Sequence, residues 1–374
     1  MKASYFLEEI SKRGIKNIAG VPDSTLKQFC DELQFQKERF NHYVTANEGA
    51  AIGLAVGSFL GSGKPICVYM QNSGLGNIVN PLTSLAHPDV YGIPMLFVIG
   101  WRGEPGVHDE PQHVFMGKVT CPMLEVLDVQ YSVIDKETTE DELAKILDAA
   151  WAAFAESKQY AIVVKKGTFA KDRVFDWDNG YPLNREEALG TVLDCVPEGA
   201  CIVSTTGKIS RELYEQSDMK YGNHDNLFMS VGGMGHASMI ALGVAAEQPS
   251  RKVVCVDGDG ATLMHMGSLS FVGAEQPKNF YHIVINNNAH ESVGSMPTGA
   301  QSLPIAEIAK KAGYADSIKI STIDEIKSIK ERIEKEEGPL LFEIMVGLNS
   351  RADLGRPKES ARENRENFMG YLGK

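Results

Sequence analysis

Short apolar runs rich in β-branched residues alternate with longer, helix-like stretches along the whole chain. Their length and composition predict strands at 65–70, 94–99, 161–164, 201–203, 253–256, 282–285 and 340–345. Strands that alternate with helices form parallel sheets whose two faces are both covered by helices. The pattern therefore predicts an α/β fold.

This alternation stops between residues 170 and 189, where charged, aromatic and turn-forming residues replace it. We expect a first domain over 1–172, a linker over 173–189, a second domain over 190–346 and a tail over 347–374. A chain of 374 residues is long for a single core, which agrees with two domains. The charged, glycine-containing tail suits a flap that a bound ligand orders as well as a disordered end.

The two halves of the chain follow one plan. In each half, a helix of small residues leads through a basic, proline-containing turn into a strand, a glycine-rich turn and another helix. The first copy begins at NEGAAIG and the second at GGMGHAS. We therefore expect two related, doubly wound parallel-sheet domains, each with a ligand edge at the carboxyl ends of its strands. A chance likeness between two α/β segments stays open.

Composition narrows the class of partner. The 49 acidic and 37 basic residues give a net charge of −12, which disfavours nucleic acid or an anionic membrane surface as the main partner. No apolar run approaches the roughly 20 residues that span a bilayer, and the first residues lack a signal-peptide pattern, so we expect a cytoplasmic protein. The six cysteines form no CxxC pair and are expected to be buried thiols.

The strongest chemical pattern joins the ends of two predicted strands. Gly258-Asp259-Gly260 closes one strand, and Asn286-Asn287 closes the next, about 28 residues later. A carboxylate and a carboxamide would then face one spot, as Mg²⁺ requires when phosphate and water oxygens complete its shell. The glycines let backbone amides approach phosphate, and the following helix offers its N-terminus. The pair of motifs therefore predicts a magnesium–diphosphate site, whereas GDG alone would indicate only a turn.

With this motif the sequence resembles the superfamily of thiamine-diphosphate enzymes. The resemblance implies thiamine diphosphate and Mg²⁺ as cofactors. It makes Asp259 and Asn287 side-chain metal ligands and the backbone carbonyl of Ala289 the third ligand, at a position where the family often has glycine. Further cofactor contacts implied by the resemblance are Asn72, Thr206, Gly207, Gly258, Gly260 and Ala261.

Two more residues match functional positions of this superfamily. Glu48, at the start of a small-residue helix, matches the glutamate that hydrogen-bonds N1′ of the aminopyrimidine and favours the imino tautomer, whose 4′-nitrogen removes the C2 proton. Met234 in VGGMG matches the residue that wedges between the two cofactor rings, and the carbonyl of Gly232 would bind the 4′-amino group. Taken alone, Glu48 also suits a partner of the helix dipole, and Met234 a core residue.

The short two-domain layout, with WRGEPGVHDEPQH and STTGKISREL, resembles the family of phosphonopyruvate decarboxylases and the related sulfopyruvate decarboxylases. It implies decarboxylation of a small anionic 2-oxo acid, with 3-phosphonopyruvate giving phosphonoacetaldehyde in phosphonate biosynthesis. Three alternatives stay open: sulfopyruvate decarboxylation, a carboligase of the acetolactate-synthase type, and a non-catalytic cofactor-binding subunit. The superfamily builds each site between two subunits, which implies at least a homodimer, with a tetramer also open.

The reaction needs a proton donor for the product and positive groups for the substrate. Candidates for the proton transfer, on loops after predicted strands, are Asp23, His108, Gln112 and His113. Each histidine alone is as well explained by a structural role. Candidate substrate-binding residues are Ser24, Arg102, Lys208 and Arg351, because a doubly anionic substrate needs cations or aligned donors.

Overall fold

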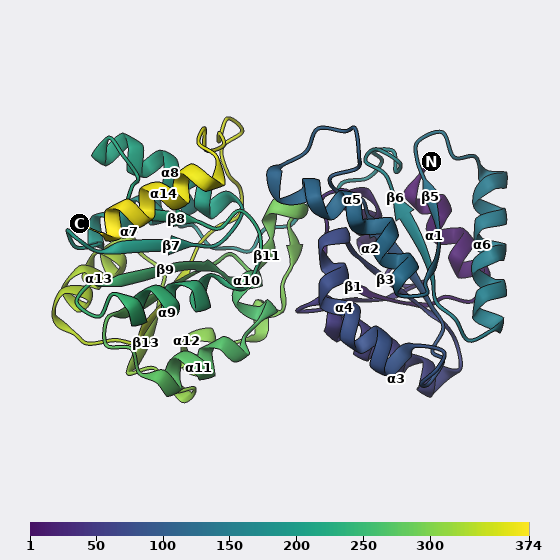
Figure 1. Cartoon of the computed structure of the whole chain (residues 1–374), viewed down its shortest axis with the longest axis horizontal. Coiled ribbons are helices and arrows are strands. Elements are labelled where there is room, and N and C mark those ends of the chain that lie inside the picture. Colours follow the sequence, from purple (N-terminus) through teal and green to yellow (C-terminus); the bar gives the residue numbers. More distant parts are fainter. Residues whose placement is uncertain (374) are drawn as a thin grey trace. The chain divides into compact units, whose positions relative to one another are not determined.

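The computed structural model describes residues 1–373 and divides into two compact units (Figure 1). The first unit contains Met1–Asp176 together with Val293–Met296, and the second begins at Trp177 and contains the rest. The division after Asp176 falls inside the range in which the sequence predicts the linker. Helix α7 (Arg185–Cys195) begins within that range, so the last residues of the predicted linker are helical.

The first unit is a parallel sheet between two layers of helices. Its elements are α1 (Ala3–Lys12), β1 (Asn17–Gly20), α2 (Lys27–Phe35), β2 (Asn41–Val44), α3 (Glu48–Ser62), β3 (Ile66–Gln71), α4 (Leu75–Pro81), β4 (Met95–Gly100), α5 (Pro111–Val126), β5 (Gln130–Ile134), α6 (Glu140–Ala155) and β6 (Tyr160–Val164). The six strands lie in the order β2-β1-β3-β4-β6-β5, and every pair is parallel.

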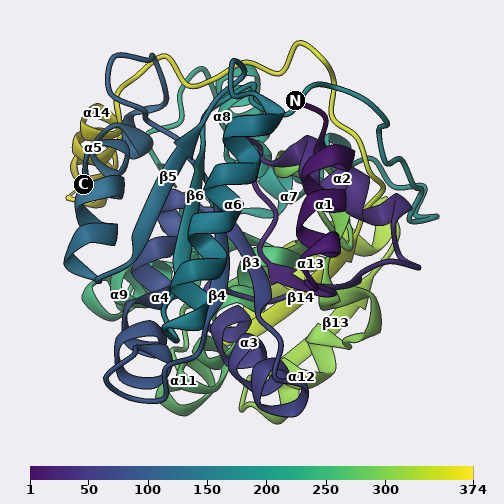
Figure 2. The same cartoon turned by 90° about the vertical axis from the view of Figure 1, so that its right-hand side faces the viewer.

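Alternate residues of the buried strand β3 supply the two cores of this unit. Cys67 and Tyr69 pack in the core formed with α1, α2 and α6, which are labelled in Figure 2. Ile66 and Val68 pack in the other core, formed with α3, α4 and α5. A strand buried on both faces reads as a continuous apolar run, which is why the sequence predicted it.

The second unit repeats this architecture. Its helices are α7 (Arg185–Cys195), α8 (Lys208–Tyr221), α9 (Ala237–Glu247), α10 (Asp259–Met264), α11 (Gly267–Glu275), α12 (Ile305–Lys311), α13 (Ile323–Lys335) and α14 (Ala361–Leu372). Its sheet strands are β7 (Cys201–Ser204), β8 (Leu227–Met229), β9 (Val253–Gly258), β10 (Phe280–Asn286), β13 (Asp316–Ile320) and β14 (Leu340–Met345), and β11 (Ala289–His290) pairs with β12 (Met296–Pro297) in a short ribbon.

The two sheets share one strand order. The second sheet runs β8-β7-β9-β10-β14-β13 when read from β8. Counted in chain order within each sheet of residues 1–373, both sheets follow 2-1-3-4-6-5. This confirms the prediction of two related, doubly wound parallel-sheet domains. In each unit the chain reverses its winding between the first and third strands, β1 and β3 or β7 and β9, and ligands of such sheets bind beyond the strand ends at that point.

Part of the tail is helical, so it is not the disordered end that its composition also suggested, and a flap ordered by a ligand stays a prediction. Helix α14 packs against β8, where the Asn364 side chain accepts from the Met229 N–H at 2.9 Å and donates to the Leu227 carbonyl at 2.8 Å. Phe368 on the same helix is buried in the core. Of the described tail, residues 347–360 and Gly373 are left outside a helix or strand. Across residues 1–373 the helices are too short or too polar to cross a membrane, and a cytoplasmic location stays a prediction.

Candidate active site

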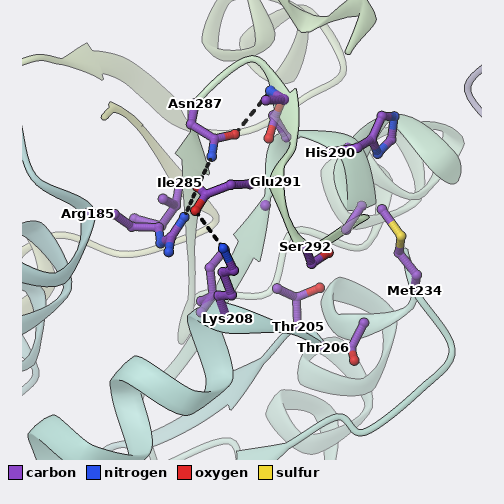
Figure 3. A pocket seen from close by; sticks show the side chains of 16 residues that line it. Arg185, Thr205, Thr206, Lys208, Met234, Ile285, Asn287, His290, Glu291 and Ser292 are labelled. Atoms are coloured by element: carbon purple, nitrogen blue, oxygen red, sulfur yellow. Dashed lines mark hydrogen bonds and ion pairs between the residues drawn. The ribbon is translucent and has the colours of Figure 1, made fainter. Parts of the chain in front are cut away.

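The carboxyl ends of three neighbouring strands of the second unit open into one pocket (Figure 3). Thr205 and Thr206 follow β7, Asp259 follows β9 and Asn287 follows β10. Because β7 and β9 flank the reversal point of this sheet, the pocket lies where the topology alone predicts a ligand. Most of the cofactor positions expected from the sequence line it: Thr206, Met234, Gly258, Asp259, Gly260, Ala261, Asn287 and Ala289.

The three expected metal ligands offer only oxygen atoms. The Asp259 carboxylate is 3% exposed and accepts from the Thr298 hydroxyl at 2.5 Å. Burial raises the pKa of Asp259 to about 7, because the carboxylate has little positive charge around it. Asn287 adds a carboxamide and Ala289 a backbone carbonyl. A buried, poorly compensated carboxylate beside neutral oxygen donors suits a hard cation such as Mg²⁺.

Two glycines leave backbone amides free to approach an anion. Gly207 precedes the 14-residue helix α8 with φ 101° and ψ −145°, a conformation open essentially to glycine alone. At Gly260, a Cβ atom would lie only 3.0 Å from the His290 ring. The Thr206 hydroxyl ties this loop to the Val231 carbonyl at 3.1 Å. Glycine-framed amides at helix N-termini bind phosphate, so these residues fit the diphosphate that the resemblance implies.

The pocket also contains charged residues that the sequence patterns did not indicate. Glu291 accepts from the Lys208 ammonium at 2.9 Å and from the Arg185 guanidinium (Figure 3). Arg185 in turn donates twice to Glu212, at 2.8 and 2.7 Å. Arg185 lies in the predicted linker and Glu291 carries no motif of its own, so no sequence signal joined them. Lys208, expected to bind substrate, therefore already has a carboxylate partner.

His290 was also missed by the sequence patterns. It forms a wall of the pocket beside Gly260. Burial lowers the pKa of His290 to about 4, so its imidazole is neutral at neutral pH.

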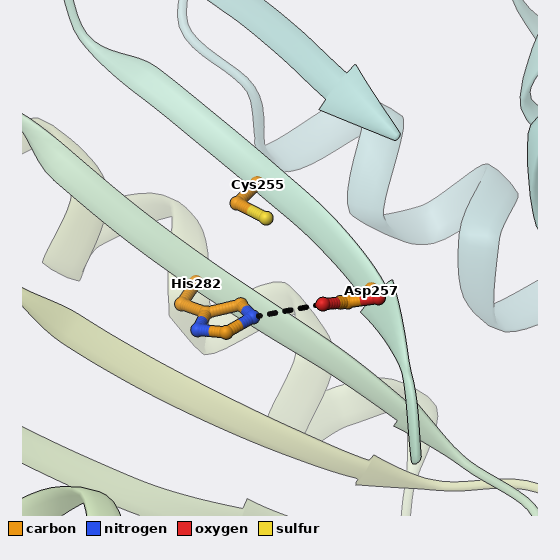
Figure 4. A group of neighbouring side chains, drawn as sticks. All are labelled: Cys255, Asp257 and His282. Carbon is orange, nitrogen blue, oxygen red and sulfur yellow. Dashed lines mark ion pairs between the residues drawn. The ribbon is translucent and has the colours of Figure 1, made fainter. Parts of the chain in front are cut away.

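A second polar group of this unit, Cys255, Asp257 and His282, lies buried on β9 and β10 (Figure 4). One ligand-type atom from each residue lies within 4.8 Å of the others. Burial raises the pKa of the Cys255 thiol well above its usual value, and a protonated thiol is a poor metal ligand. His282 faces Asp257, with 3.8 Å between Nε2 and Oδ2, and can compensate that buried charge when protonated. None of the three lines the pocket described above.

In the first unit, the strand ends at the reversal point carry another polar cluster. Asp23 follows β1 and is fully buried, and its carboxylate accepts from the Gln71 amide at 2.6 Å and from the Thr25 N–H at 2.9 Å. Burial raises the pKa of Asp23, although these hydrogen bonds act against the shift. Gly100, at the end of β4, makes room for Asp23, because a Cβ there would lie 2.1 Å from its carboxylate oxygen.

Arg102 links this cluster to the loop before α5. Its guanidinium donates to Asp109 at 2.8 and 2.5 Å and to the Ser24 hydroxyl at 3.0 Å. The Asn72 side chain fixes the Arg102 backbone by accepting from its N–H at 3.1 Å and donating to its carbonyl at 2.8 Å. Burial acts to raise the pKa of Asp109, but Arg102 and a backbone N–H hold it at about 2. Asn72, Ser24 and Arg102 are thus brought together.

The remaining proton-transfer candidates differ in exposure. His108 is exposed, whereas Gln112 and His113 are half-buried at the start of α5. Burial lowers the pKa of His113 to about 4, and the nearby Arg102 charge adds to the effect.

Glu48 is the first residue of α3 and is 5% exposed. Its carboxylate accepts from the Asn77 amide at 2.7 Å. It also packs so closely on Gly74 that a Cβ there would lie 2.5 Å from Oε1. Glu48 is thus fixed by the Asn77 hydrogen bond and by close packing on Gly74. An acidic residue that only stabilised the helix dipole would need neither contact. Neither Asn77 nor Gly74 stood out in the sequence.

Three expected residues of the second unit lie outside the pocket lining: Arg351, Gly232, and Gly207, which stands between the lining residues Thr206 and Lys208. Arg351 is exposed, with its guanidinium paired to Glu186 at 3.0 Å and to Glu215. Gly232 is half-buried, two residues before the lining residue Met234.

Comparison with known proteins connects the two units to one enzyme class. Residues 2–121 match the model "Thiamine pyrophosphate enzyme, N-terminal TPP binding domain", and residues 206–344 match its C-terminal counterpart. The chain is 34% identical to a phosphonopyruvate decarboxylase of Streptomyces viridochromogenes, over 96% of this chain and 92% of that protein. It is 35% identical to one of Streptomyces hygroscopicus (99% and 94%) and 26% identical to a sulfopyruvate decarboxylase of Methanosarcina acetivorans (84% of each).

Proposed function

This chain belongs to the phosphonopyruvate decarboxylase family of thiamine-pyrophosphate enzymes, and we propose that it converts 3-phosphonopyruvate to phosphonoacetaldehyde and carbon dioxide. It is a decarboxylase of a 2-oxo acid that depends on thiamine diphosphate. The observation that carries the proposal is the pocket of the second unit, in which oxygen ligands for Mg²⁺ and a glycine-framed anion cradle line the same walls.

Each cofactor group has a matching set of residues in this proposal. Asp259, Asn287 and the Ala289 carbonyl would hold Mg²⁺, and the amides beside Gly207 and Gly260 would bind the diphosphate. Thiamine diphosphate supplies the electron sink that stabilises the charge left when carbon dioxide departs. The Mg²⁺ role rests on the donor set described above.

Residues of the first unit are proposed to handle protons. Glu48, oriented by Asn77, would hydrogen-bond the aminopyrimidine ring of the cofactor. Asp23 and His113 are the best candidates for the proton transfer that completes the product. Burial raises the pKa of the Asp23 carboxyl, and it lowers the pKa of His113 to about 4, so that His113 is neutral at neutral pH. His108 is exposed to solvent and the amide of Gln112 is not an acid, so both are weaker candidates.

We propose that Arg102 and Ser24 bind an anionic end of the substrate. Arg102 is half-buried and rigidly held, and its fork of donors suits a phosphonate or carboxylate. Asp109 offsets part of the positive charge of Arg102, so a substrate anion would share the guanidinium with the Asp109 carboxylate. Lys208 is the further candidate, with Glu291 as its partner. Arg351, paired away from the pocket lining, is the weakest of the four tentative positions.

Release of carbon dioxide tests the substrate directly. Phosphonopyruvate, sulfopyruvate and pyruvate are compared with and without thiamine diphosphate and Mg²⁺. We expect cofactor-dependent turnover that is fastest on phosphonopyruvate. Faster turnover of sulfopyruvate would keep the reaction and change the substrate. Absence of turnover on all three substrates, despite cofactor binding, would favour the carboligase or the non-catalytic subunit.

We also propose that the active enzyme is at least a homodimer, with each site shared by two copies. Glu48→Gln and Asp259→Asn would each be inactive alone. Mixed subunits should recover activity, because hybrids contain one site with both native residues. Mixtures that stay inactive although the subunits have exchanged would contradict shared sites. An active monomer would contradict the dimer.

A further inference from the structure

Asn287 can serve as a metal ligand in only one of two amide orientations. Its carboxamide carries an oxygen, which can bind a cation, and an NH₂ group, which cannot. Turning the amide by half a revolution exchanges the two atoms at nearly no steric cost. Something in the structure must therefore keep the oxygen on the side of the metal.

Glu291 is the neighbour that distinguishes the two orientations. The Asn287 Nδ2 atom donates to Glu291 Oε2 at 2.8 Å. An ionised carboxylate accepts hydrogen bonds and donates none, so the flipped amide would set oxygen against oxygen. On the other side, Oδ1 accepts from the Ala289 N–H at 3.1 Å and keeps a second lone pair. Both contacts select the same orientation.

Glu291 is itself held from three directions (Figure 3). Besides Asn287, it accepts from Lys208 at 2.9 Å and from Arg185. Arg185 is fixed by its two bonds to Glu212, and both residues are buried, at 3% and 1% exposure. Two carboxylates and two cations balance one another in this cluster, so no net charge is left behind Asn287.

We propose that Glu291 is a positioning residue for the metal. It sets the amide of Asn287 so that Oδ1 is available to Mg²⁺, and Arg185 and Lys208 keep its carboxylate in place. The inference rests on the proposed function, because it takes Asn287 as a Mg²⁺ ligand. It assigns a role to a residue that neither the motif nor the strand-end pattern singled out.

The test is the Mg²⁺ affinity of the full chain, measured by calorimetric titration in the presence of equimolar thiamine diphosphate. In Glu291→Gln, the new amide cannot accept from three donors at once, and Asn287 loses its preferred orientation. We expect Mg²⁺ to bind about 10- to 100-fold more weakly, the usual effect of removing a group that orients a metal ligand. Glu337→Gln is the matched control, because Glu337 forms an exposed pair with Lys278 at 3.0 Å.

A charge-conserving exchange separates orientation from a merely structural effect. In the double variant Asn287→Asp with Glu291→Gln, the NH₂ group of residue 291 donates to a carboxylate at 287. Residue 287 then presents oxygen in either orientation, and the pair keeps one negative charge. Mg²⁺ affinity should recover toward the native value. Unfolding temperatures of all variants, taken without Mg²⁺, show whether each protein is folded.

The outcomes distinguish this inference from the function on which it rests. Native affinity in Glu291→Gln, or a double variant as weak as Glu291→Gln, would overturn the positioning role. Weakened binding in the single variant with recovery in the double variant supports it. Asp259→Asn is measured beside them, and unchanged Mg²⁺ affinity there would refute the proposed metal site itself.

Discussion

Gly207 offers a sharp test of the diphosphate cradle, because a methyl group there changes backbone freedom and little else. A Cβ at Gly207 would find its nearest neighbours, atoms of Ser292, at 3.9 Å, which is ordinary contact. The backbone has φ 101° and ψ −145°, however, a region that costs other residues about 1–3 kcal/mol. Gly222, at the other end of α8, has φ 71° with nothing within 4 Å and is the matched control.

The two substitutions should separate stability from affinity. Gly222→Ala strains the chain equally with and without cofactor, so the unfolding temperature falls by about 2–4 °C and affinity is unchanged. Without cofactor, Gly207→Ala relieves its strain by turning the loop, which moves the amides of the α8 N-terminus. Binding must restore the strained conformation. Up to about 3 kcal/mol of binding free energy is then lost, so thiamine diphosphate should bind about 5- to 100-fold more weakly than to the native chain.

Calorimetric titration with thiamine diphosphate and Mg²⁺ measures the first quantity, and thermal unfolding without cofactor measures the second. If Gly207→Ala bound the cofactor with native affinity and lost only as much stability as Gly222→Ala, Gly207 would not frame the diphosphate. If Gly222→Ala also weakened binding, the effect would belong to α8 as a whole.

Three further predictions follow from other contacts. Gly74→Ala places a Cβ 2.5 Å from the Glu48 carboxylate, so turnover should fall about 10²-fold or more. The control Gly76→Ala adds a methyl group in open space and should leave turnover unchanged. Equal turnover in both variants would remove Glu48 from the mechanism. Asp259→Asn removes a buried, poorly compensated carboxylate, so in the presence of a chelator its unfolding temperature should be no lower than that of the native chain. Added Mg²⁺ should not raise the unfolding temperature of this variant. A Mg²⁺-dependent rise as large as in the native chain would contradict the ligand assignment. Burial lowers the pKa of His42 from 6.5 to about 4, so as the pH falls the unfolded chain takes up a proton at this residue before the folded chain does. The native chain therefore loses stability as the pH falls from 6.5 to 4. Between pH 7 and pH 5, the free energy of unfolding measured in urea should fall by about 2 kcal/mol less in His42→Gln than in the native chain.

Central strands were easier to predict from the sequence than edge strands. The predicted runs correspond to β3, β4, β6, β7, β9, β10 and β14, which lie inside their sheets. The pattern missed β2, β5, β8 and β13, which are the four edges of the two six-stranded sheets. Strand β5, QYSVI, has polar residues because part of it faces solvent. A strand buried on one side or for few residues leaves too weak an apolar run to stand out.

The sequence by itself determined which strand ends bring the proposed metal ligands together. Asp259 and Asn287 each follow a buried strand, and parallel strands present their carboxyl ends at one edge, so local spacing was enough to bring them together. The same reasoning predicted Gly260, because an anion cradle at a helix N-terminus needs a residue without a side chain. Gly207 was implied only by the resemblance to thiamine-diphosphate enzymes.

Only the tertiary structure decided which distant residues hold these groups. Arg185 and Glu291 are 106 positions apart, and Asn77 meets Glu48 across 29. No periodicity or motif links such pairs, because their contact depends on how helices pack on the sheet. Burial likewise sets the raised pKa values of Asp23 and Asp259, since desolvation depends on every atom around a carboxylate and not on its neighbours in the chain.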